Sequence, residues 1–110
     1  MYVYRAKLDR LIGPVSMSVA IDLGFRLELV VPVRLDGVTL PEKRREAQAL
    51  TKEWLALRPE GFVLQSVQGH RQTFDRWFGV IMDDDGASLN QALLDSGLVK
   101  PYKSGEAEDE

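Results

Sequence analysis

Apolar side chains alternate with polar ones along the first third of the chain, a spacing that suits strands and excludes an all-helical fold. It predicts strands over residues 2–11, 15–21 and 25–33. Pro32 in the third strand indicates an edge or a bulge, because proline cannot donate to a sheet. One face of the first strand holds Tyr2, Tyr4, Ala6 and Leu8, and the third alternates inward through Phe25, Leu27, Leu29, Val31 and Val33.

The spacing becomes helical after Pro41 and stays so until Arg58-Pro59, which ends the segment. This predicts an amphipathic helix of about four turns. The apolar residues that recur at helical spacing are Ala47, Leu50, Trp54 and Leu57.

Residues 62–68 and 76–82 return to strand patterns. Ser88 and Gln91 then fit a capping box that opens a helix from about Leu89 to Ser96, and Gly97 can take the left-handed conformation that closes it. Asp83-Asp84-Asp85 lacks the spacing of a calcium loop and indicates a solvated hairpin turn.

Three strands, a helix, two strands and a final helix predict a mainly β fold with helices (α+β), namely a five-stranded OB-type barrel. The 110 residues, 45% of them hydrophobic, suffice for one core. We therefore expect one barrel domain over residues 1–102 and a disordered acidic tail over residues 103–110.

Charge and composition exclude several classes of site. The chain has no cysteine and one histidine, so any metal would need oxygen ligands. Four of the 17 acidic residues lie in the tail, which leaves 13 against 14 basic residues, and this body lacks the strong positive field of a general nucleic-acid binder. Charged residues interrupt every apolar run near the N-terminus, so we expect a cytoplasmic protein with no membrane partner.

Five stretches of the chain, in order and spacing, resemble the staphylococcal-nuclease-like family, and above all its short phage- or prophage-encoded members. They are YRAKLDRLI, SVAIDLGF, VRLDGVTLPE, EAQALTKEWL and DRWFGVIMDDDGASLNQALLDSGLVKPY. The resemblance covers nearly everything from Tyr2 to Tyr102. It implies the same barrel, with a calcium-dependent phosphodiester-cleaving site at its mouth.

Three catalytic positions of that family are matched: Arg34 and Arg76 fall on its phosphate-binding arginines, and Glu42 falls on its proposed general base. The two acidic calcium ligands are not matched. Val15 and Thr39 stand in their places. Because calcium needs about six to eight oxygen ligands, we predict no metal site and no catalytic activity.

Two interpretations of the arginines stay open. In one, Arg34 and Arg76 clamp a phosphate, with Arg71 and Phe74 as further contacts to nucleic acid. In the other, the arginines form a structural ion pair with Glu42 or with a nearby carboxylate at the barrel mouth. The predicted function is accordingly a catalytically inactive binding module of phage or prophage origin, without a cofactor, whose partner is single-stranded nucleic acid or a host protein.

The alternative is a weak calcium-dependent nuclease in which Asp22 or Asp36 rebuilds the metal site. Both aspartates also suit turns, since each lies shortly before a glycine.

Overall fold

The computed structural model describes residues 2–67 and 77–103, and it consists of five strands and two helices within that part of the chain. The strands close into a barrel in the order β1-β2-β3-β5-β4. The elements are β1 (Tyr2–Gly13), β2 (Ser16–Gly24), β3 (Leu27–Leu35), α1 (Arg44–Ala56), β4 (Phe62–Val67), β5 (Trp77–Met82) and α2 (Leu89–Asp95). The predicted OB-type barrel is confirmed.

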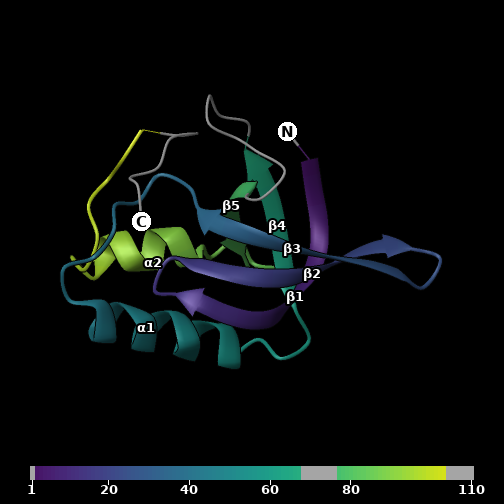
Figure 1. The fold of residues 1–110 in the computed structure, drawn as a ribbon, viewed down its shortest axis with the longest axis horizontal. Coiled ribbons are helices and arrows are strands. Elements are labelled where there is room, and N and C mark those ends of the chain that lie inside the picture. The colour runs from purple at the N-terminus through teal and green to yellow at the C-terminus, as the bar shows by residue number, and fades with distance from the viewer. Residues whose placement is uncertain (1, 68–76, 104–110) are drawn as a thin grey trace.

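The barrel closes through one parallel seam, while its other strand pairs are antiparallel. The seam joins β3 to β5 over three residue pairs, from Val33 opposite Trp77 to Leu35 opposite Gly79. Figure 1 shows both helices on the same side of the barrel, at the end away from the projecting β2–β3 hairpin. The described helices are too short and too polar to cross a membrane.

The inner face of β1 differs from the predicted one. Ala6 is buried, whereas Tyr2 is 62% exposed and Leu8 is 38% exposed. The cause is a change of partner: residues 2–6 pair with β4, residues 6–13 pair with β2, and the register shifts after Leu8. A strand that coils between two neighbours cannot keep one face inward along its whole length.

The first half of β3 also departs from prediction. Val31 and Val33 are buried as expected, but Leu27 and Leu29 are exposed, and Phe25 lies in the turn before the strand. The reason is that β2 and β3 run on past the barrel as a two-stranded hairpin, which leaves no sheet to cover these side chains (Figure 1). Pro32 lies opposite Ser18 of β2, just before the pairing with β5 begins, so it occupies an edge position, as predicted.

Helix α1 packs on the barrel through Ala47, Thr51, Trp54 and Leu55. The Thr51 hydroxyl donates to the carbonyl of Pro14 at 2.8 Å and so ties the helix to the β1–β2 turn. Leu57, which shares the helical spacing of the buried residues, is 71% exposed because the helix ends before it.

Helix α2 begins as predicted, with the Ser88 hydroxyl accepting from the Gln91 amide at 3.2 Å. The second half of the capping box is absent, because the Gln91 side chain donates to Asp95 instead. Gly97 takes the left-handed conformation expected of it, with a φ of 78°.

Asn90 connects α2 to the closing seam. Its side-chain amide donates to the carbonyls of Asp36 (2.8 Å) and Gly79 (3.2 Å), and its oxygen accepts from the Ile81 amide (3.1 Å). Asn90 is only 5% exposed, so water cannot replace these bonds.

We predict that Asn90→Leu lowers the free energy of unfolding by about 2–4 kcal/mol, because it deprives three buried backbone groups of a partner. Urea denaturation followed by circular dichroism measures this change. Gln91→Ala, at the neighbouring exposed position, is the control, and it should change the free energy of unfolding by less than about 0.5 kcal/mol. Equal effects of the two variants would contradict the role given to Asn90.

Candidate functional site

Three segments that the resemblance assigns to a catalytic site meet at one end of the barrel. The Leu35 amide donates to the carbonyl of Val15 at 2.9 Å, which joins the end of β3 to the β1–β2 turn. Ser16, the next residue in that turn, lies opposite Arg34. The Arg34 guanidinium in turn donates to the carbonyl of Val38 at 2.8 Å. The first turn, the end of β3 and the segment before α1 are therefore neighbours.

Val15 is part of the hydrophobic core, with none of its surface exposed. Its carbonyl is already engaged by Leu35. The position that would carry the first metal ligand thus presents an apolar side chain to apolar neighbours. A divalent cation placed there would lose hydration without gaining a side-chain oxygen.

Thr39 holds the C-terminal segment in place. Its amide donates to the carbonyl of Lys100 at 2.9 Å, and its hydroxyl accepts from the Lys100 amide at 2.9 Å. Next to it, Val38 bridges to Pro101, and the Tyr102 amide donates to Gly37. The Thr39 hydroxyl, at the position to which the resemblance assigns the second metal ligand, therefore has a structural partner, and the segments 37–39 and 100–102 run side by side.

Glu42 is exposed on the rim of an open pocket of about 360 Å³. The residues around this pocket are Thr39, Leu40, Glu42, Lys43, Ser96, Gly97, Leu98, Val99 and Lys100. Thr39 and Glu42 therefore share one surface depression, as the resemblance implies, but Arg34 does not line it.

Arg34 lies with its side chain fully buried at the end of β3. Its guanidinium donates to the carbonyls of Leu35 and Val38, and so it fixes the bend by which the chain leaves the strand. The ion pair with Glu42 that the sequence suggested does not form within residues 2–67 and 77–103. These contacts give Arg34 a structural role, and its role as a phosphate clamp stays a prediction.

The other predicted contacts to nucleic acid lie outside the described residues. These are Arg71, Phe74 and Arg76, all in the segment 68–76.

The two aspartates of the alternative metal site are far apart. Asp22 lies opposite Glu28, eight residues before Asp36, which places them roughly 25 Å apart along β3. The Asp22 carboxylate accepts from the Gly24 amide at 2.8 Å, which is the predicted turn role. In the described part of the chain, no three acidic or histidine side chains come close enough to hold a metal ion.

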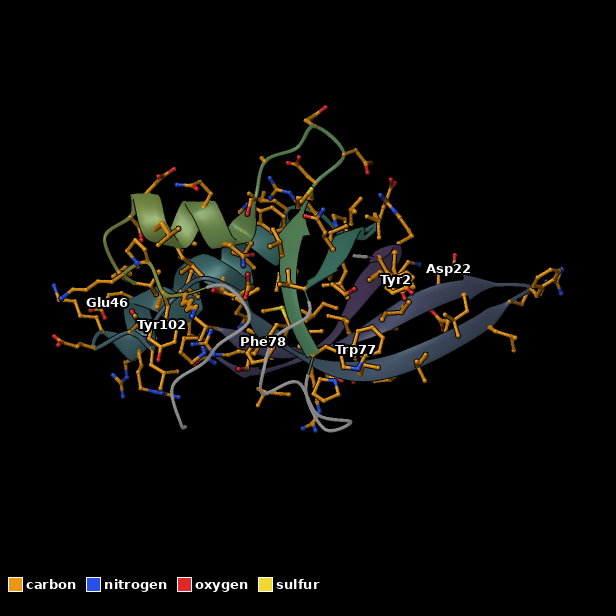
Figure 2. The ribbon with its side chains drawn as sticks, turned by 90° about the horizontal axis from the view of Figure 1, so that it is seen from above. Tyr2, Asp22, Glu46, Trp77, Phe78 and Tyr102 are labelled. Atoms are coloured by element: carbon orange, nitrogen blue, oxygen red, sulfur yellow. The ribbon has the colours of Figure 1, made fainter. Side chains whose placement is uncertain are left out.

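A row of aromatic rings on the barrel surface is a feature that the sequence interpretation missed. The rings of Tyr2 and Tyr4 are 6.4 Å apart, and those of Tyr4 and Trp77 are 6.1 Å apart. Figure 2 shows Tyr2 and Trp77 on the same side of the barrel, far along the long axis from Tyr102. Tyr4 packs against the core, as its predicted inward position requires, whereas Tyr2 is exposed, because the alternation of β1 cannot show where the strand changes partners.

The acidic turn after β5 is a hairpin turn, as predicted, and Asp83 organises it. One carboxylate oxygen accepts from the amides of Asp85 (3.0 Å) and Ala87 (2.9 Å), and the other accepts from Arg58 at 2.8 Å. The hydrogen bond from Arg58, and then that from Ala87, lower the pKa of Asp83 from its ordinary value of 3.8. Arg58 is itself held 3.6 Å from the centre of the Trp54 ring.

A scan against models of known protein families finds no match for this chain, and a search of curated proteins finds none.

We predict that Asp83→Asn destabilises the protein at neutral pH and that the difference from wild type shrinks in acid. Because the pKa is lower in the folded state, the carboxylate stabilises the fold above the unfolded-state pKa, near 3.8. That contribution is lost as the pH falls through the folded-state pKa. Urea denaturation at pH 7 and at stepwise lower pH measures the difference.

Asparagine keeps the oxygen that accepts from Ala87 but loses the one that accepts from Arg58, so the pH dependence of the difference is what reports the charge. Asp85→Asn is the matched control, since no side-chain contact of Asp85 is found in the turn; we expect it to show no such trend. A difference for Asp83→Asn that stays constant with pH would show that the charge is not responsible.

Proposed function

We propose that this chain is a metal-free, catalytically inactive nuclease-like domain that acts as a binding module. The nuclease-like part, and the phage or prophage origin that goes with it, rest on the resemblance of the sequence. The proposed lack of activity is supported by the two positions to which the resemblance assigns metal ligands. Val15 is packed in the core, and the Thr39 hydroxyl accepts a hydrogen bond from the Lys100 amide.

Loss of the metal removes the group that would stabilise charge on the phosphate during cleavage. Such stabilisation is worth several kcal/mol, which corresponds to several orders of magnitude in rate. Glu42 alone cannot replace it, because a carboxylate next to a phosphate adds repulsion. Binding is less dependent on the metal than cleavage is, so a binding role is the function that these residues support best.

Single-stranded nucleic acid is the partner that the aromatic row favours. Bases stack on aromatic side chains whatever their sequence, and each stacked base contributes about 1–3 kcal/mol. Tyr2 offers the most accessible ring, being 62% exposed, and Tyr4 and Trp77 continue the row. The near-neutral body of the protein adds little general attraction for phosphates, so the affinity must come mainly from stacking.

We expect calcium neither to bind nor to support cleavage. Titration calorimetry with calcium should give no heat of binding, the melting temperature should not change with calcium, and single-stranded DNA should remain intact. Glu42→Gln should behave as wild type in all three measurements. Calcium-dependent cleavage that disappears in Glu42→Gln would overturn the proposal in favour of an active nuclease.

We expect a fluorescently labelled oligothymidine to bind at low salt, and Tyr2→Ala to weaken this binding by about fivefold or more, as the loss of one stacked base requires. Anisotropy titration measures the affinity. Tyr102→Ala, which removes a tyrosine at the other end of the molecule (Figure 2), is the matched control and should leave the affinity unchanged. Absence of binding even at low salt would exclude the nucleic-acid partner and leave a protein partner.

A further inference from the structure

The outer part of the β2–β3 hairpin stands clear of the barrel (Figure 1). We call residues 22–30 the arm. Within the described chain, β2 pairs with β1 only as far as Ile21, opposite Ala6, and β3 pairs with β5 only from Val33 onward. The two strands of the arm therefore pair only with each other, and both outer edges of the ribbon are open.

The tip of the arm holds an aromatic ring in water. Gly24, Phe25 and Arg26 form a turn with φ values of 79°, 53° and 62°, a left-handed conformation that residues other than glycine rarely adopt. This turn leaves Phe25 96% exposed. The two central residues, Phe25 and Arg26, make a turn that matches the twist of the flanking strands, so the ring is carried at the end of a regular ribbon.

One face of the arm continues the apolar face of the barrel. Val31 is buried in the core, and the same alternation leads outward to Leu29 (43% exposed) and Leu27 (59% exposed). Leu23 on the other strand is 48% exposed. Together with Phe25, these side chains give the arm roughly a few hundred Å² of exposed apolar surface, about the size of the largest apolar patch on a typical monomer, which is often functional.

The other face of the arm carries its charged residues beside Val30, which is 56% exposed. Asp22 and Glu28 lie directly opposite each other, an arrangement of like charges that is unfavourable within one hairpin. Arg26 lies two residues from Glu28, and no described acidic side chain forms an ion pair with it.

The end of the arm is complementary to itself when a second copy is reversed about Leu27. Leu27 and Glu28 open β3, and Arg26 is the last residue of the turn before them. Laid antiparallel to a second copy, this segment sets Leu27 against Leu27 and Arg26 at the tip of one arm beside Glu28 of the other. Apolar side chains then share one face, and opposite charges meet twice on the other. A two-fold axis produces this arrangement, in which each surface patch meets its own copy.

We propose that two copies of this chain associate through their arms, laid antiparallel about a two-fold axis near Leu27. The partner is a second copy because the pattern of charge and apolar residues fits its own reverse. An open edge without lysine adds backbone groups that a neighbouring strand can pair with. A few hundred Å² from each copy is less than the roughly 800 Å² per partner of a standard stable interface, so the dimer is weak and depends on concentration.

Sedimentation equilibrium of the full chain tests the association. The expected mass rises with concentration toward twice the chain mass of 12.4 kDa. Leu27→Ser should weaken dimerisation at least about a hundredfold, because the side chain of both copies is lost from the contact. Leu57→Ser is the matched control, since Leu57 is 71% exposed on the end of α1, and it should dimerise as wild type does.

Exchanging the charges of Arg26 and Glu28 tests the antiparallel orientation of the two arms. This test remains valid even if Leu27→Ser fails to fold. Arg26→Glu and Glu28→Arg, each alone, should weaken the dimer about tenfold or more by setting like charges together. The double variant Arg26→Glu/Glu28→Arg should restore it. A wild type that stays monomeric at the highest soluble concentration would overturn the proposal, and so would a dimer that neither the single charge variants nor Leu27→Ser weakens.

Discussion

The parallel seam between β3 and β5 is the contact on which the rest of the molecule depends. Only three residue pairs close the barrel there, so each must fit closely. At Gly79 a β-carbon would lie 2.6 Å from a Leu64 methyl and 3.2 Å from a Val33 methyl, so any larger residue there would force the buried Leu64 side chain to move. Asp36 extends the seam by donating to the Gly79 carbonyl, and Asn90 covers its end. Closure removes the exposed edges that an open five-stranded sheet would have.

The two positions to which the resemblance assigns metal ligands contribute to this same framework. A carboxylate at Val15 would place a charge inside the core next to the seam, and it would be tolerated only with a cation beside it. Valine places no charge there and packs in the core. Thr39 uses its hydroxyl to bind the C-terminal segment, and Arg34 uses its guanidinium to fix the bend by which the chain leaves β3. Packing and hydrogen bonds thus stabilise this end of the barrel.

The fold was predictable because alternation, helical spacing and short apolar runs are local signals; β5 is such a run, and the other strands and both helices carry one of the two spacings. The errors have a common cause: local spacing shows that a strand has two faces but not where its neighbours end. Tyr2 and Leu8 are exposed where burial was predicted because β1 changes partners. Leu27 and Leu29 are exposed because β2 and β3 extend beyond the barrel. The bonds of Thr39 to Lys100 join residues far apart in sequence, which no local pattern reveals. Arg71, Phe74 and Arg76 lie outside the described residues, so their predicted roles stay predictions.

The aromatic row and the arm begin at the same place in the sheet, and this links the two proposals. Ala6 lies opposite Ile21, so Tyr4 is two residues past the point at which β2 separates from β1 to enter the arm. A dimer joined through its arms therefore carries two aromatic rows that are related by the two-fold axis. A single-stranded nucleic acid long enough to reach both rows would bind the second row in an intramolecular step, at an effective concentration set by the arms. Weak stacking on one barrel can then give useful affinity for a long single-stranded nucleic acid, because association of the arms brings two aromatic rows within reach of one molecule.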